Sequence, residues 1–298
     1  MPSKKEKFGR GCERGALGRA NLRTAATTQG GIQVLYGLIH YNAPGDTLEE
    51  FLNYAAEAGF DCVELQIGDL WPERGDPEER ADEVRVMLED RGLKCSAVAA
   101  GNDFNVIDED QVRQQVERFQ RVCELAMIVR APVIRTEGGA PKEDCPEERW
   151  VEAISNCILD CLDFVEDMGL ILAVDNHGWI TNNPDVLLNI LEVVDSPQVG
   201  TNLDTMNYRW YGHPVEVLPY IYERVAPWVK STHFKDGTGS RGDYRGTALG
   251  EGEIPLESAV WALKAAGYQG AWVAEYEGPR DQAAEGYRRC LQWLRENT

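Results

Sequence analysis

Four residues with metal-binding or acid–base side chains follow apolar runs of the chain at a regular spacing. Asp175 ends LILAVD, Asp204 ends VGTNLD, His233 lies in VKSTHFKD, and Glu275 lies in AWVAEYEG. The intervals from Asp175 to Asp204 and from Asp204 to His233 are both 29 residues. Carboxylates that crowd one pocket raise one another's pKa unless a cation compensates them. Three carboxylates and one imidazole therefore predict a site for one divalent metal ion. Mainly oxygen donors favour Mn²⁺, Mg²⁺ or Co²⁺, and they also admit Zn²⁺.

A repeated strand-and-helix pattern would bring these four residues together, whereas each aspartate alone would more simply be a helix cap or a turn residue. From residue 31 onward, an apolar strand, a polar loop and an amphipathic helix recur eight times, and several of the helices end at a glycine (AEAGF, EDRGL, EDMGL and KAAGY). Strands are expected at 32–40, 62–67, 94–100, 132–137, 170–177, 199–204, 229–236 and 271–278, and helices at 47–58, 77–90, 109–127, 146–167, 184–194, 214–225, 256–266 and 281–295.

This alternation of strands and helices predicts a parallel sheet. No Gly-rich dinucleotide-binding motif follows the first strand, so a closed (β/α)8 TIM barrel is favoured over an open doubly wound sheet. We expect one barrel domain over residues 31–298. Because the C-terminal ends of the strands converge at one mouth of such a barrel, all four candidate ligands would meet there.

The net charge of −20 is unevenly placed along the chain. Residues 1–30 carry seven basic side chains against Glu6 and Glu13, which leaves a net charge of −25 on the remainder. We expect this basic N-terminal arm to be disordered. An acidic body of that size repels nucleic acid and anionic lipid, and it suits a neutral substrate or a bound cation.

Composition also bears on the compartment. No run of the sequence approaches the roughly 18 apolar residues that a membrane helix needs, and the N-terminus lacks the apolar core of a secretory signal. We therefore expect a cytoplasmic protein without a membrane partner, and the sequence leaves open whether it forms a homo-oligomer. The eight cysteines are scattered without a CxxC pair, so buried free thiols are expected rather than disulfides or zinc ligands.

Five short motifs carry a resemblance to a known family. The runs VDNHG, NLDTMN, THFKD, LGEGEI and VAEYEG, in this order at the strand ends, resemble the sugar phosphate isomerase/epimerase family of xylose isomerase-like barrels over residues 31–295. The resemblance implies that Asp175, Asp204, His233 and Glu275 hold the metal. It also implies that the carboxylates of Asp175 and Glu275 flank the substrate and exchange a proton with the carbon beside its carbonyl. Many members have a glutamate where this chain has the shorter Asp175, so Glu275 is our first choice as the general base.

Further polar residues at the strand ends are candidates for contact with the substrate. Lys235 could stabilise negative charge on a substrate oxygen, and His177 could bind or protonate a hydroxyl. Glu137 could supply the reach that the short aspartate of the fifth strand lacks. His40 ends the first strand and either faces the pocket or is a hydrogen-bonded structural histidine. Arg245 lies in the Gly-rich loop after the seventh strand.

The function predicted from these features is a metal-dependent isomerase or epimerase that acts on a sugar, a keto-sugar or a cyclitol through enediolate-type proton transfer. A lyase on the same metal site is the alternative, either a dehydratase of a cyclic hydroxy-ketone or an enzyme that cleaves a C-glycoside. A non-catalytic sugar-binding barrel is less favoured. An abasic-site endonuclease is disfavoured by only four histidines and an acidic body. Aromatic residues after three strands hint at a substrate larger than a triose: Trp71, Trp179, Trp210 and Tyr211.

Overall fold

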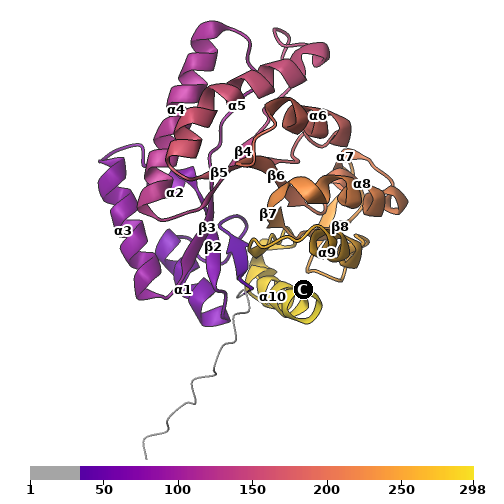
Figure 1. Ribbon diagram of the computed structural model, residues 1–298. Coiled ribbons are helices and arrows are strands. Elements are labelled where there is room, and N and C mark those ends of the chain that lie inside the picture. Colours follow the sequence, from indigo (N-terminus) through magenta and orange to yellow (C-terminus); the bar gives the residue numbers. More distant parts are fainter. Residues whose placement is uncertain (1–33) are drawn as a thin grey trace, which may run out of the picture. The chain divides into compact units, whose positions relative to one another are not determined.

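The computed structural model describes residues 34–298, so the basic arm predicted for residues 1–30 lies outside the described residues. Eight parallel strands form one sheet in the order β10-β1-β2-β3-β4-β5-β6-β7 (Figure 1). These strands are β1 (Tyr36–Ile39), β2 (Cys62–Gln66), β3 (Lys94–Ala99), β4 (Val133–Glu137), β5 (Ile171–Asp175), β6 (Val199–Asp204), β7 (Val229–His233) and β10 (Trp272–Ala274).

The sheet closes on itself between β7 and β10. Phe234, directly after β7, forms a parallel bridge with Ala274. The N–H of Phe234 donates to the carbonyl of Val273 at 2.7 Å, and the N–H of Glu275 donates to the carbonyl of Phe234 at 2.9 Å. These bonds join the two ends of the strand order, and the predicted (β/α)8 barrel is confirmed.

Helices follow the strands and lie around the outside of the barrel (Figure 1). The longer helices are α1 (Leu48–Ala58), α3 (Pro77–Asp90), α4 (Glu109–Ile128), α5 (Trp150–Asp167), α6 (Pro184–Val194), α8 (Leu218–Val225), α9 (Leu256–Ala265) and α10 (Ala283–Asn297). Two short helices in loops were not predicted, α2 (Ile67–Leu70) and α7 (Asn207–Tyr211), and 3₁₀ turns lie at Glu147–Arg149, Val215–Val217, Ala226–Trp228 and Arg280–Gln282.

Local sequence signals set the helix ends. The Thr47 hydroxyl accepts a hydrogen bond from the N–H of Glu50 at the start of α1. Asn183 caps α6 in the same way, and Pro184 stands at its first turn, where a missing N–H costs nothing. The predicted helix-terminating glycines all have positive φ: Gly59, Gly92, Gly169 and Gly267.

The structure corrects the predicted strand 229–236. Strand β7 ends at His233, and β8 (Asp236–Thr238) instead pairs antiparallel with β9 (Arg245–Thr247). The turn is fixed by the Asp236 carboxylate, which accepts backbone N–H groups at 2.8–3.2 Å from Gly237, Gly250, Gly252 and Ile254. The LGEGEI motif therefore wraps around one carboxylate beside the barrel mouth.

No helix within residues 34–298 is long and apolar enough to cross a membrane. Each cysteine of the described residues is buried with a free thiol, as predicted: Cys62, Cys95, Cys123, Cys145, Cys157, Cys161 and Cys290.

Candidate metal centre

Three of the predicted ligands meet at the C-terminal ends of neighbouring strands. Asp204 ends β6, His233 ends β7, and Glu275 directly follows β10. All three are buried, and one ligand atom from each lies within 4.8 Å of the others. Metal–ligand bonds of about 2.0–2.2 Å place opposed donor atoms about 4 Å apart. The three donor atoms can therefore hold one ion if they move slightly closer together. The barrel thus positions two carboxylates and an imidazole around one point.

The two oxygens of the Asp204 carboxylate have different surroundings. Its Oδ1 accepts the N–H groups of Met206 and Asn207, both at 2.9 Å. Its Oδ2 is buried and faces the ammonium of Lys235, whose Nζ lies 2.8 Å away. Burial raises the pKa of Asp204 to about 6, because the nearby charge of Lys235 only partly opposes it. A buried carboxylate oxygen that faces a cation, and not a backbone N–H group, fits a metal ligand, because a bound ion can compensate its charge in the same way.

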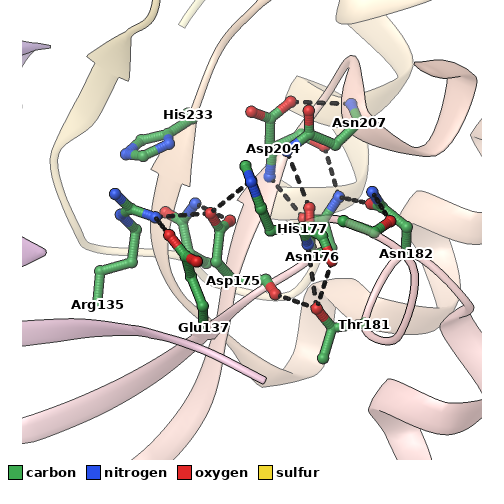
Figure 2. Close-up of polar contacts among 12 residues, drawn as sticks. Arg135, Glu137, Asp175, Asn176, His177, Thr181, Asn182, Asp204, Asn207 and His233 are labelled. Atoms are coloured by element: carbon green, nitrogen blue, oxygen red, sulfur yellow. Dashed lines mark hydrogen bonds and ion pairs between the residues drawn. The ribbon is translucent and has the colours of Figure 1, made fainter. Parts of the chain in front are cut away.

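The motifs VDNHG and NLDTMN interlock and thereby orient Asp204, as Figure 2 shows. The Oδ1 atom of Asn176 accepts the N–H of Asp204 at 2.7 Å, while its Nδ2 donates to the Asp204 carbonyl at 3.0 Å. Asn207 in turn donates to the Asn176 carbonyl at 3.0 Å. The ends of β5 and β6 are therefore held in register by side-chain amides.

His233 lies between two carboxylates. Its Nε2 is 2.7 Å from Oε2 of Glu64, a fully buried residue of β2, and its Nδ1 is 3.0 Å from Oε2 of Glu275. Burial alone would lower the pKa of His233, but Glu64 and Glu275 raise it to about 10. The contact with Glu64 fixes the ring and leaves Nδ1 facing Glu275, an arrangement common in metal-binding histidines.

Lys235 is a buried ammonium among the same carboxylates. Its Nζ lies 2.8 Å from Asp204 Oδ2, 3.3 Å from Glu275 Oε1 and 3.7 Å from Glu277 Oε2. Burial alone would lower the pKa of Lys235, but Asp204 and Glu275 hold it well above its usual range. Burial would likewise raise the pKa of Glu275, yet Lys235 and then His233 hold it well below its usual range. Glu275 is therefore ionised at neutral pH.

Asp175 does not belong to the cluster of three candidate ligands, and Figure 2 shows its carboxylate beside Arg135. Its Oδ2 lies 2.7 Å from Nη1 of Arg135, and its Oδ1 accepts Nδ2 of Asn202 at 2.7 Å. Burial alone would raise the pKa of Asp175, but Arg135 lowers it, so the carboxylate is ionised. Each carboxylate oxygen has two lone pairs, so these two contacts still leave acceptor capacity on Asp175.

Sequence reasoning missed Glu64 and Arg135. The guanidinium of Arg135 on β4 also places Nε 2.6 Å from Oε1 of Glu64, so it bridges β2 and β5 inside the barrel. Both are charged residues directly after two apolar residues of a strand run, CVELQI and PVIRTE, and that pattern was the available signal.

The predicted substrate contacts are spread around the mouth. The His177 side chain is half exposed, with Nδ1 3.8 Å from Asp175 Oδ2, and the Glu137 carboxylate lies 3.8 Å from Arg135. Arg245 is exposed on β9. His40 pairs with Asp69 at 2.9 Å and stacks on the Phe51 ring, with 4.3 Å between the ring centroids. These are the contacts expected of a hydrogen-bonded structural histidine.

The chain forms a closed parallel barrel with buried carboxylates and a histidine at the C-terminal ends of its strands. These features place it in the class of (β/α)8 barrels that have their site at the C-terminal mouth. Within this class, the chain belongs to the xylose isomerase-like TIM barrel family, whose model matches residues 52–297.

Known proteins that resemble the chain include a 3-dehydroshikimate dehydratase of Pseudomonas putida. It is 23% identical over 281 residues, which are 85% of this chain but 40% of the dehydratase. Two solved structures, each 16% identical, share the fold over 89% of this chain. One is the IOLI protein with a bound zinc atom, at a TM-score of 0.73 and 99% of its chain. The other is the 3-keto-D-glucoside 4-epimerase YcjR of E. coli, at a TM-score of 0.71 and 100% of its chain.

Proposed function

We propose that the protein is a divalent-metal-dependent isomerase or epimerase that acts on a sugar, a keto-sugar or a cyclitol. The observation that carries the proposal is the meeting of Asp204, His233 and Glu275 within 4.8 Å at the barrel mouth. Epimerases and a zinc-containing protein among the structural neighbours support it.

In this proposal, Asp204, His233 and Glu275 hold the ion, and Asp175 supplies a fourth ligand through its remaining lone pairs. Arg135 and Asn202 orient the Asp175 carboxylate, as Glu64 orients the His233 ring. An oxygen-rich set of this kind favours Mn²⁺, Mg²⁺ or Co²⁺ and also admits Zn²⁺. A divalent ion bound there would polarise a substrate carbonyl and acidify the neighbouring C–H group.

The chain's own residues then move the proton. Glu275 has a second carboxylate oxygen that can accept the proton from carbon, and it is ionised because Lys235 and His233 hold its pKa low. Lys235 would stabilise negative charge that develops on a substrate oxygen. His177, half exposed at the mouth, would bind a hydroxyl or return a proton to it.

Elemental analysis of the wild type beside Asp204→Ala and His233→Ala, each loaded with Mn²⁺, Co²⁺, Mg²⁺ or Zn²⁺, tests the proposal. We expect one equivalent of metal in the wild type and loss of metal in both variants. Incubation with keto-sugars in D₂O should then place deuterium at a single carbon. A folded wild-type protein that takes up no metal would refute the site.

A lyase on the same site is the second candidate. The relative that favours it is the 3-dehydroshikimate dehydratase, an enzyme named for a dehydration. Loss of water next to a carbonyl also begins with removal of a proton, so the same carboxylates would serve. Absorbance separates the two functions, because a lyase accumulates a conjugated product whereas an epimerase reaches an equilibrium mixture.

A further inference from the structure

A cavity opens at the barrel mouth beside the metal centre. Its volume is about 610 Å³, and its lining includes Tyr41, Asn42, Trp210, Tyr244, Glu277 and Arg280. None of the candidate metal ligands lines it. Sites for small molecules commonly have volumes of about 300–1,000 Å³ and aromatic walls, so this cavity has the size of a binding site.

The cavity adjoins the metal centre. Glu277, which lines it, has Oε2 3.7 Å from Nζ of Lys235, and that ammonium contacts both Asp204 and Glu275. Tyr41 lines the cavity together with Glu277, and burial and then the charges of Glu277 and Glu275 raise the pKa of its phenol. A ligand at the metal centre that extends past Glu277 would therefore enter the cavity.

The walls come from four separate segments of the chain that hydrogen bonds to backbone carbonyls hold in place. Asn42 has φ of 45°, and its Nδ2 donates to the carbonyls of Tyr276 and Gly278 at 3.0 Å, which ties the loop after β1 to the loop after β10. The Trp210 carbonyl on α7 accepts the N–H of Arg241 at 2.9 Å, which ties α7 to the loop that carries Tyr244. The aromatic side chains are thus presented by a fixed frame.

The polarity of the cavity indicates what it binds. Three aromatic rings, Tyr41, Trp210 and Tyr244, offer flat apolar faces, and the Glu277 carboxylate on the side of the metal centre would repel an anion. The Arg280 guanidinium is committed to the backbone, since it donates to the carbonyl of Ala43 and to that of Gly45. A neutral ring fits this lining, and a phosphate does not.

We propose that this cavity is a subsite for the aglycone ring, either sugar or aryl, of a neutral glycoside whose reacting sugar lies at the metal centre. The inference rests on the proposed function and narrows its substrate class to glycosides. Trp210 is the residue on which the ring stacks.

The test measures binding of matched ligands to the metal-loaded full chain by calorimetry. The ligands are methyl and 4-nitrophenyl glycosides of glucose and galactose, with methyl cellobioside and methyl lactoside as two-sugar counterparts. Because stacking on one aromatic ring strengthens binding substantially, we expect a ring aglycone to bind about tenfold more tightly than methyl in at least one series. Trp210→Ala should abolish this gain, and Trp210→Phe should retain most of it. Trp261→Ala, which removes an exposed tryptophan of α9, is the matched control and should leave the gain intact.

The pattern of affinities distinguishes an aryl aglycone from a sugar aglycone. A gain for the nitrophenyl ligands assigns an aryl aglycone, and a gain for the disaccharides assigns a sugar. Equal affinities for methyl and ring aglycones in both series, or a gain that survives Trp210→Ala, would overturn the subsite. Metal content and deuterium exchange report on the proposed function independently. An enzyme that binds metal and exchanges deuterium, but binds ring and methyl aglycones equally, would refute only the subsite. Tighter binding of a ring aglycone by a protein that takes up no metal would refute only the metal-dependent reaction.

Discussion

Arg135 and Asp175 form an ion pair that is almost completely buried inside the barrel, with Nη1 of the arginine 2.7 Å from Oδ2 of the aspartate. The same guanidinium pairs with Glu64 at 2.6 Å, so one cation compensates two buried carboxylates. Glu64 in turn contacts Nε2 of His233, and Asp175 accepts a hydrogen bond from Asn202. Arg135 therefore links two predicted ligands, Asp175 directly and His233 through Glu64.

Substitution of Arg135 should therefore destabilise the fold strongly. Arg135→Met leaves Glu64 and Asp175 buried without their cation, and breaking a buried pair in this way costs about 3–5 kcal/mol. Urea unfolding in the presence of EDTA measures the change in the free energy of unfolding. The control is Arg130→Met, which removes an exposed arginine paired with Glu89 at 2.9 Å and should cost less than about 1 kcal/mol. Equal effects of the two substitutions would contradict the prediction.

The Glu64 contact should set the strength of metal binding. Glu64→Gln keeps the shape of the side chain but removes the charge that holds Nε2 of His233 at 2.7 Å. Loss of such a supporting partner lowers metal affinity about 10- to 100-fold. Titration of the metal-free protein with Mn²⁺ by calorimetry gives the affinity, and Glu73→Gln on the exposed surface serves as the control. A Glu64→Gln protein with wild-type affinity would show that Glu64 does not support the ligand.

Lys235 and a bound ion should compete for the same carboxylates. The ammonium lies 2.8 Å from Asp204 and 3.3 Å from Glu275, and like charges about 4 Å apart repel by about 4 kcal/mol at an effective dielectric constant of 20. Lys235→Met should therefore bind Mn²⁺ at least about tenfold more tightly than the wild type. It should also lose activity, because no ammonium remains to stabilise a substrate oxyanion.

Thermal unfolding with and without Mn²⁺ gives a second measure for Lys235→Met. Without metal, Asp204 and Glu275 lose their nearest ammonium, so the variant should unfold at a lower temperature than the wild type. With metal, the increase in the unfolding temperature should exceed that of the wild type, because ligand binding stabilises in proportion to the logarithm of its affinity. A smaller increase would mean that Lys235 assists metal binding rather than opposing it.

The position of the three clustered ligands could be predicted from the sequence because a parallel barrel brings equivalent positions of successive strands to one mouth. Glu64 and Arg135 could not be placed in this way. They lie within β2 and β4, and their contacts with His233 and Asp175 cross the barrel interior between strands that are not sequence neighbours. The end of β7 was also predicted wrongly, since only the folded loop reveals that Asp236 binds four backbone N–H groups.

The buried thiols make a separate prediction about reactivity. Burial raises the pKa of Cys62, Cys123, Cys157 and Cys290 to about 12, so almost no thiolate forms in the native protein at pH 8. A Cys12→Ser variant removes the one cysteine outside the described residues. With a disulfide reagent at pH 8, this variant should react at fewer than one thiol in minutes, and at all seven in guanidinium chloride. Rapid reaction of several native thiols would contradict the buried placement.

Asp236 should control the order of the loop that carries Tyr244. Its carboxylate accepts four backbone N–H groups, and hydrogen bonds to a charged group contribute about 1.5–3 kcal/mol each, so Asp236→Ala should release residues 237–254 while the barrel strands stay paired. Arg241 and Arg245 in this loop offer trypsin sites, and limited proteolysis with mass spectrometry should detect cleavage there. Asp243→Ala is the matched control, because that carboxylate accepts the N–H of Ser240 alone. Equal cleavage of the two variants would show that Asp236 is not what holds the loop against the barrel mouth.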